Sequence, residues 1–384
     1  MTSKSTPSPF KILVSEDVIN DLKNRLSLTR WPDEIPESPW QYGTSLKYLK
    51  ELVHYWKTEY DWRAHERRLN NFDQFKVKIN DVDLHYIYMP GKGPDPIPII
   101  LSHGWPGSIY EFIRIIGPLS DPSSYGGNSK DAFTIVAPSL PGYGFSQIHN
   151  NTRLGLKEIA KVFVTLMTDV LGFSKFAAQG GDWGALITSY LGFQYPERVL
   201  GIHLNMIGAF PAQEDMKDLS ASEVEFLQKA GSIQDEIGYQ WIQGTRPQTL
   251  AYGLNDSPTG LAAWITEKFY AWTDCHGDIE KSVSKDDLLS NIMIYWVTQT
   301  INSSFWLYYW YRHDPWNLKP GEKIKVPTGF AAFPGEIITP PKEWIERIYN
   351  LKRYTPMESG GHFAALEKPQ ELVTDIRNFF RELR

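Results

Sequence analysis

The stretch "AAQGGDWGAL" at residues 177–186 decides how the rest of the chain is interpreted. An apolar segment leads into Gly180 and Gly181, Asp182 follows, and Gly184 precedes a helical pattern. Glycines on both sides of one polar residue let the backbone turn sharply between a strand and a helix, which exposes that residue's side chain. An acyl-transfer enzyme would need a hydroxyl or a thiol at this position. The sequence therefore predicts a catalytic turn whose central side chain is a carboxylate.

Apolar segments and helical patterns alternate through most of the chain after residue 74. Strands are predicted within the segments 75–79, 82–90, 97–108, 133–146, 175–184, 199–206 and 326–334, and near 351–357. Helical patterns are found at 154–171, 185–194 and 369–383. Strands that alternate with helices form parallel sheets. We therefore predict the α/β class with a mostly parallel sheet.

Two further segments precede or interrupt this alternation. Residues 208–320 are mostly helical and rich in aromatic side chains, which predicts a helical lid inserted after the sixth strand. Residues 10–30 and 44–70 have the apolar spacing of amphipathic helices. The predicted organisation is an N-terminal helical extension over 1–73, a core over 74–207 and 321–384, and the lid over 208–320.

Composition excludes several classes of partner. A net charge of −6 and a pI near 5.9 give no basic surface for nucleic acid or for an anionic membrane. Cys275 is the only cysteine, so no internal disulfide forms and a reducing cytoplasm is expected. The N-terminal residues lack the apolar core of a signal peptide, and no segment has the roughly 18 to 20 apolar residues of a membrane helix. We expect a soluble cytoplasmic protein with no membrane anchor.

Motifs for metals and cofactors are missing from the sequence. It contains no H-E-x-x-H, no P-loop and no G-x-G-x-x-G after a predicted strand. We expect neither a cofactor nor a metal ion. Seven of the nine histidines are scattered, and we interpret them as structural or surface residues along with His103.

Three predicted strands end in residues that suit catalysis. Asp182, Glu336 and His362 follow in the chain order nucleophile, acid, base, which is the order of α/β-hydrolases. The carboxyl ends of parallel strands meet at one edge of a sheet, where such folds hold their chemistry. An aspartate next to glycine or a lone histidine after two glycines is usually structural. The three together, in this order, predict a catalytic triad.

A carboxylate nucleophile selects the electrophile. Serine attacking an sp³ carbon would form a stable ether, whereas aspartate forms an ester that water can cleave. Asp182 is ionised at neutral pH, so the alkylation step needs no general base. His362, held by Glu336, is then free to activate water against the ester. Epoxides and alkyl halides fit this chemistry, and ordinary esters do not.

Ester hydrolysis also needs donors for the developing oxyanion. The segment "HGWPGS" (103–108) follows its strand at the usual position of an oxyanion loop. We predict that the backbone N–H groups of Trp105 and Trp183 are the donors. His103 is interpreted as a residue that organises this loop, because His362 already fills the role of base.

Across nearly its whole length the sequence resembles the microsomal-type epoxide hydrolases, including their soluble fungal members. The motifs that carry the resemblance are "HGWPGS", "GGDWG", "LNDSPTGLAAWITEKF", "VPTGFAAFPGE" and "GGHFAALEKP". The resemblance implies an α/β-hydrolase core, no cofactor, a detoxifying hydrolysis of apolar or aromatic epoxides, and two lid tyrosines that hold the epoxide oxygen. By position these fall on Tyr239 and Tyr308, with Tyr309 and Tyr311 as competitors for the second. The acid is Glu in some members and Asp in others, so Glu336 fits.

Two other functions share part of this chemistry or fold. A haloalkane dehalogenase shares the aspartate and histidine chemistry, but it holds halide with Trp or Asn N–H donors and typically lacks the N-terminal extension. A hydrolase fold that serves only as a binding protein would have lost a triad member, and all three are present. The sequence leaves open the natural substrate, its preferred enantiomer and whether the chain forms a homodimer.

Overall fold

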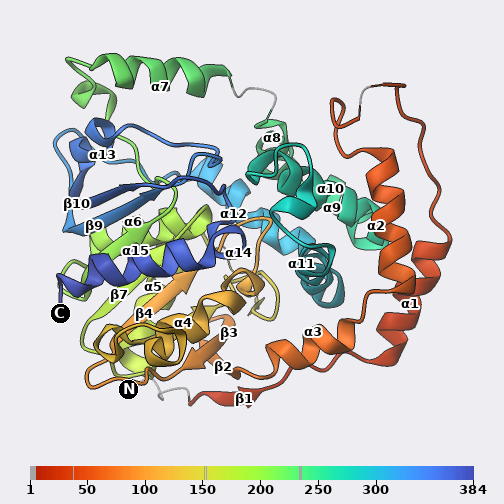
Figure 1. Cartoon of the computed structure of the whole chain (residues 1–384), viewed down its shortest axis with the longest axis horizontal. Coiled ribbons are helices and arrows are strands. Elements are labelled where there is room, and N and C mark those ends of the chain that lie inside the picture. Colours follow the sequence, from red (N-terminus) through yellow and green to blue (C-terminus); the bar gives the residue numbers. More distant parts are fainter. Residues whose placement is uncertain (1–5, 38, 151, 153, 233–235) are drawn as a thin grey trace.

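The computed structural model describes residues 6–37, 39–150, 152, 154–232 and 236–384. Within this part of the chain, ten strands form one sheet in the order β1-β2-β3-β5-β4-β7-β8-β9-β10, with β6 beside β3 (Figure 1). The strands are β1 (Ser8–Phe10), β2 (Asp73–Ile79), β3 (Val82–Met89), β4 (Ile97–Ser102), β5 (Phe133–Pro138), β6 (Gln147–Ile148), β7 (Phe176–Gly180), β8 (Val199–Leu204), β9 (Ile324–Ala332) and β10 (Tyr349–Pro356). All eight predicted strands are present, and the short edge strands β1 and β6 were not predicted.

The sheet is antiparallel at one end and parallel through the rest. β1, β2, β3 and β5 pair antiparallel, whereas β5, β4, β7, β8, β9 and β10 are parallel to one another. Every residue of β5 and β7 is buried, as is typical of parallel strands covered on both faces. Helices α5 (Leu156–Thr165) and α6 (Trp183–Gln194) pack together on the sheet, and α4 (Ile116–Ser120) and α15 (Pro369–Arg381) form a second pair (Figure 1). The predicted fold class is confirmed.

The N-terminal segment contains three helices, α1 (Glu16–Ser27), α2 (Leu46–Thr58) and α3 (Trp62–Leu69). The prediction of a single helix over 44–70 is wrong, because the segment forms two helices that are divided just before Asp61. Its side chain accepts a hydrogen bond from the backbone N–H of Arg63 and caps the start of α3. The helix expected over 10–30 is shorter and covers Glu16–Ser27, while Ser8–Phe10 form an edge strand on β2.

The lid region lies between β8 and β9. It contains α7 (Ala221–Ser232), α8 (Gly238–Thr245), α9 (Pro247–Asp256), α10 (Pro258–Trp272), α11 (Lys285–Thr298) and α12 (Ile301–His313). Helices α1 and α2 of the N-terminal segment pack against α10. Arg25 binds Asp256 at 2.7 Å, and the Thr44 hydroxyl donates to the Ala263 carbonyl at 2.6 Å. The extension therefore connects the edge of the sheet to the lid.

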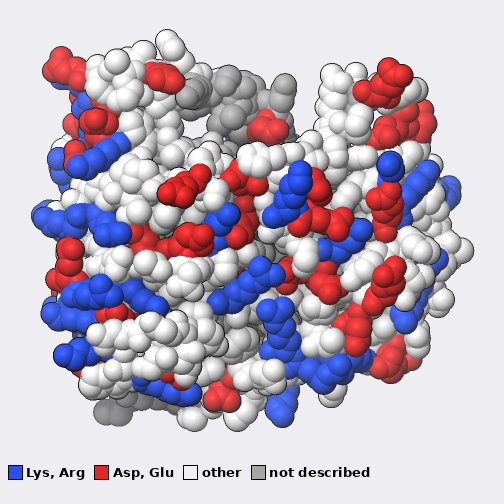
Figure 2. All heavy atoms as spheres, in the orientation of Figure 1, with Lys and Arg blue, Asp and Glu red and all other residues white. Residues whose placement is uncertain are grey.

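Two short helices lie beside the last strand, and the surface carries charges of both signs. Helices α13 (Lys342–Ile348) and α14 (Ala364–Glu367) flank the last strand. On the face shown in Figure 2, lysine and arginine side chains are interspersed with aspartate and glutamate. None of the helices in the described ranges combines the length and the apolar character that crossing a bilayer requires.

Candidate active site

Asp182 lies in a strained turn between β7 and α6. Its backbone has φ +51° and ψ −130°, a conformation that side-chain-bearing residues rarely adopt. The flanking glycines are required because their neighbours are too close for a side chain. A Cβ on Gly184 would lie 1.9 Å from the Ser102 carbonyl oxygen, and one on Gly180 would lie 2.2 Å from the Gly184 oxygen. This crowding explains why the motif has glycines on both sides of Asp182.

Backbone N–H groups donate to the carboxyl group of Asp182. The Trp105 N–H donates to Asp182 Oδ1 at 2.7 Å, which brings the "HGWPGS" loop against the turn. Burial raises the pKa of Asp182, while the charge of His362 and hydrogen bonds from the Trp105 and Trp183 N–H groups oppose that rise. Both predicted oxyanion donors are therefore positioned at the carboxyl group.

His103 joins two loops beside this site. Its Nδ1 lies 3.0 Å from the Gly104 carbonyl oxygen, and its Nε2 accepts from the Leu140 N–H at 3.1 Å. Because a carbonyl can only accept, the ring proton is on Nδ1. Burial lowers the pKa of His103 to about 4, so this ring is neutral at physiological pH.

His362 bridges the other two members of the predicted triad. Its Nδ1 lies 2.7 Å from Glu336 Oε1, and its Nε2 lies 3.6 Å from Asp182 Oδ2. Burial by itself favours the neutral imidazole, but the charge and hydrogen bond of Glu336 and the charge of Asp182 outweigh it. Together they raise the pKa of His362 to about 9. Glu336 is itself oriented by the Ile337 N–H, which donates to the same Oε1 at 2.7 Å.

Two lid tyrosines lie over the catalytic turn. Tyr239 on α8 stacks on Trp105, with ring centroids 5.1 Å apart and planes at 12°. Tyr308 on α12 meets Trp183 edge to face at 4.8 Å, and the two tyrosine rings are 5.8 Å apart. Burial raises the pKa of both phenols, and the negative charge of Asp182 raises it further. The lid thus adds two protonated phenols to the site.

The neighbouring tyrosines of α12 point elsewhere. Tyr309 stacks on His313 with centroids 4.2 Å apart, away from the turn. Tyr311 touches Trp183 at 5.3 Å, but its hydroxyl donates to the Trp316 carbonyl at 3.4 Å. Of the three residues considered for the second donor, Tyr308 alone packs against Tyr239.

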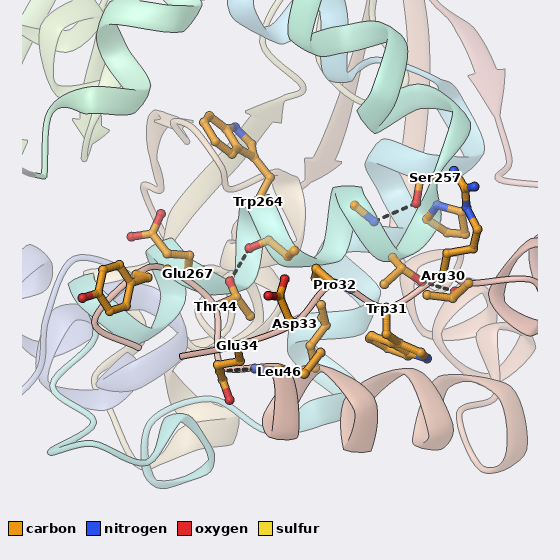
Figure 3. A pocket seen from close by; sticks show the side chains of 18 of the residues that line it. Arg30, Trp31, Pro32, Asp33, Glu34, Thr44, Leu46, Ser257, Trp264 and Glu267 are labelled. Carbon is orange, nitrogen blue, oxygen red and sulfur yellow. Dashed lines mark hydrogen bonds between the residues drawn. The ribbon is translucent and has the colours of Figure 1, made fainter. Parts of the chain in front are cut away.

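The space around these residues is small. Asp182 and His362 line an internal cavity of about 20 Å³, and both lid tyrosines are buried. A much larger pocket of about 1010 Å³ lies between residues 25–49 of the extension and 256–267 of the lid (Figure 3). Figure 3 labels Trp31 and Glu34 from the extension and Trp264 and Glu267 from α10 among the side chains that line it. None of the triad residues lines that pocket, so we do not assign the chemistry to it.

Among the described residues, no group of three or more His, Cys, Asp or Glu side chains is arranged to hold a metal ion. The polar side chains next to Asp182 are instead joined to one another and to backbone N–H groups. What they can do chemically is nucleophilic attack, proton transfer and oxyanion stabilisation.

Comparison with known proteins supports one family. The family model "Epoxide hydrolase N terminus" matches residues 7–112, and the model "alpha/beta hydrolase fold" matches residues 97–230. Epoxide hydrolase 1 of Oryctolagus cuniculus is 39% identical over an alignment that covers 97% of this chain and 88% of the rabbit protein. The chain belongs to the epoxide hydrolase family.

Further relatives agree with this membership. A Stigmatella aurantiaca protein named "Putative epoxide hydrolase" is 41% identical to this chain. The alignment covers 98% of this chain and 85% of that protein. The structure of Aspergillus niger epoxide hydrolase superposes with a TM-score of 0.85 and 31% identity, covering 100% of this chain and 98% of that one. The predicted family and the predicted α/β-hydrolase fold are thereby confirmed.

Several polar residues of this epoxide hydrolase site were not identified from the sequence, among them Gln179 and Asn205. Glu111 lines the small cavity together with Asp182 and His362. Lys268 on α10 is buried, lies 2.7 Å from Glu267 Oε2, and has its ammonium 4.7 Å from the Tyr239 ring centroid. The sequence pattern does not mark Glu111 or Lys268 as a site residue, because a lone glutamate or lysine in a helical segment is normally solvated.

Proposed function

We propose that this epoxide hydrolase converts an apolar or aromatic epoxide to a vicinal diol through an ester on Asp182. The supporting observation is the arrangement around that carboxyl group. One oxygen accepts the Trp105 N–H, while the other is 3.6 Å from His362 Nε2 and free to attack. Aromatic side chains enclose the site, and Trp105, Trp272 and Phe305 are almost fully buried. Such walls favour a substrate with an apolar body.

In the first step, the Asp182 carboxylate attacks one carbon of the epoxide ring. A C–O bond to Asp182 forms and the ring C–O bond breaks, which leaves an alkoxide. Tyr239 and Tyr308 donate hydrogen bonds to this oxygen, and one of them supplies the proton. The raised pKa of the two phenols keeps them protonated and able to donate throughout the neutral pH range.

The second step depends on a change in charge. Once Asp182 is an ester, it no longer contributes the negative charge that helps raise the pKa of His362 to about 9. The histidine then releases its proton, which restores the phenol, and becomes a neutral base. His362 takes a proton from water, and the hydroxide attacks the ester carbon while the Trp105 and Trp183 N–H groups stabilise the oxyanion. The ester C–O bond breaks, and the diol oxygen receives the proton from His362.

The same proposal assigns roles to the parts of the chain. Residues 74–207 and 321–384 form the catalytic core, 208–320 the lid that supplies the phenols, and 1–73 an extension that wraps both. Residues 1–5, 38, 151, 153 and 233–235 lie outside the described part of these segments. The single cysteine supports a reducing compartment, and we propose the cytoplasm.

Halide displacement is the second candidate, and one observation favours it. The indole Nε1 atoms of Trp105 and Trp183 are buried and have no hydrogen-bond partner among the described residues. Unpaired indole N–H groups suit a halide ion. The paired phenols favour the epoxide, because an alkoxide leaves only when it is hydrogen-bonded or protonated. Diol formation from styrene oxide, set against halide release from matched alkyl halides, separates the two activities.

A single turnover in heavy-oxygen water tests the covalent step. The expected result is label on the Asp182 carboxylate and none in the first diol formed, since the diol oxygens come from the epoxide and from the unlabelled carboxylate. Asp182→Ala abolishes turnover. Label in the first diol would mean direct attack by water, and the proposed mechanism would then be wrong.

A further inference from the structure

The small cavity beside Asp182 has room for one water molecule. Its volume is about 20 Å³, and one water needs roughly 10 to 15 Å³ together with two to four polar partners. Polar groups from four parts of the fold line it: Glu111, Gln179, Asn205, Asp182 and His362. The cavity therefore meets both requirements, and it adjoins the carboxyl group and the imidazole that the proposed mechanism uses.

Glu111 is built into the wall of this cavity. It follows the oxyanion loop, in a short 3-10 turn over Ile109–Arg114. Its carboxyl group packs against Gly107 so closely that a Cβ there would lie 1.5 Å from Glu111 Oε1. The side chain is partly buried and lines the cavity. Gly107 thus leaves the space in which this carboxyl group reaches the triad.

Gln179 supplies a second acceptor on the same wall. It is the last but one residue of β7, immediately before the catalytic turn, and is 1% exposed. Its Nε2 donates to Asn205 Oδ1 at 2.9 Å, which fixes the orientation of the amide. Its Oε1 has no hydrogen-bond partner within the described part of the chain. A buried amide oxygen without a partner is costly, and a bound water would satisfy it.

We propose that Glu111 and Gln179 hold the water that hydrolyses the Asp182 ester. This inference rests on the proposed function. In the resting enzyme the water donates its two hydrogens to these two acceptors. After alkylation, the neutral His362 replaces one of them, and the water oxygen faces the ester carbon. The O–H bond to His362 breaks as the bond to that carbon forms, so no further reactant is needed.

The protonation of Glu111 agrees with this role. Burial raises the pKa of Glu111 to about 8, with the positive charge of His362 opposing the rise and the charge of Asp182 adding to it. At neutral pH the group is therefore mostly a neutral carboxyl. Its carbonyl oxygen accepts a hydrogen from water, and it does not compete with Glu336 for the imidazolium.

Single-turnover kinetics on purified full-length variants test the inference. With styrene oxide as the probe, rapid quenching and intact-mass measurement follow the ester as it forms and decays. Glu111→Leu slows ester hydrolysis on the order of 10²-fold, as expected for a misplaced reactant, with little change in ester formation. Glu111→Gln, whose amide oxygen still accepts, restores most of the hydrolysis rate. Gln179→Met gives the same selective defect to a smaller extent.

A matched control separates position from the mere loss of a buried carboxyl group. Glu66 on α3 is buried, accepts from the Val14 N–H at 2.7 Å and does not line the cavity. Glu66→Gln changes neither step. A high-resolution crystal structure of the wild-type enzyme is expected to contain one ordered water within hydrogen-bond distance of Glu111 and Gln179.

Each outcome decides one point. Normal ester hydrolysis in Glu111→Leu, an equal slowing of both steps, or a crystal structure without that water overturns the inference. If Glu111→Leu does not fold, Gln179→Met is judged by the same two rate constants. If the wild-type enzyme forms no ester, the proposed function fails as well. An ester that forms normally and decays normally in the variants overturns the water site alone.

Discussion

Removing the hydroxyl groups of the two lid tyrosines isolates the alkylation step. The rings of Tyr239 and Tyr308 are 5.8 Å apart, so both phenols reach one oxygen atom between them. Loss of one donor leaves the other in place, and the expected cost is on the order of 10²-fold, about 2.7 kcal/mol, as for one oxyanion donor. In the double variant the alkoxide forms without either phenol donor, and we expect the rate of alkylation to fall on the order of 10⁴-fold or more.

The substitutions to phenylalanine preserve the packing on which the lid depends. Trp105 and Trp183 keep their ring contacts. The Tyr239 hydroxyl loses a hydrogen bond from the exposed Gln240 side chain, 3.0 Å away, and its hydrogen bond with Tyr308. The cost in stability should therefore be under about 1 kcal/mol. Tyr309→Phe is the matched control, because it removes a hydroxyl from the same helix away from the turn.

Stopped-flow tryptophan fluorescence follows the first step, since Trp105 and Trp183 adjoin the reacting carboxyl group. The expected result is a slow fluorescence change in each single variant and none on the same time scale in the double variant. Ester formation near the wild-type rate in the double variant would refute the assignment of both phenols. A defect in Tyr309→Phe with none in Tyr308→Phe would show that the second donor was placed one residue too early.

Three further predictions concern the triad, the pH and the extension. Glu336→Gln slows ester hydrolysis far more than ester formation in rapid-quench experiments. Glu336 orients His362 through its 2.7 Å contact and stabilises the positive form of the imidazole. Equal slowing of both steps would assign the role of the triad acid to another carboxylate. The melting temperature of the resting enzyme falls as pH rises from about 6.5 to about 9. The pKa of His362 is about 9 in the folded chain, so its protonation stabilises the fold fully below the pKa of the unfolded chain, and this stabilisation is lost as pH rises through the folded pKa. Glu111, with its pKa raised to about 8, acts in the same direction, so a melting temperature that rises over this range would contradict both shifts. Deleting residues 1–70 exposes the apolar surface under α1 and α2, and we expect the truncated protein to aggregate when it is measured by light scattering. A monodisperse, active truncated protein would exclude this structural role.

Local patterns predicted the strands, the catalytic turn and the family, because those features depend on residues adjacent in sequence. The turn needs glycines at fixed positions around Asp182, and strands such as β5 and β7 bury a continuous apolar segment. The triad, the oxyanion donors and the lid tyrosines stay predictions until they are tested, although the structure brings them together. The sequence could not show which tyrosine of α12 packs against Tyr239, because this depends on how that helix is rotated about its own axis in the folded lid.

What the sequence did not indicate depends on contacts between distant segments. Glu111 and Gln179 are 68 positions apart, and only the pairing of β4 with β7 brings their segments to one cavity. The split between α2 and α3 depends on a single capping side chain, Asp61, in an otherwise uninterrupted apolar pattern. The edge strand β1 has only three residues, too few for an alternating pattern to be recognised.

The contacts between the extension and the lid also determine the order in which the molecule can be completed. Arg25 and Asp256 are separated by 231 positions, and Thr44 and Ala263 by 219. On the ribosome, α1 and α2 are made first, yet their partner α10 follows only after most of the sheet has been synthesised. Closing such long loops is slow, because their entropy is lost before the contacts form. The first helices of the chain are consequently among the last to reach their native positions.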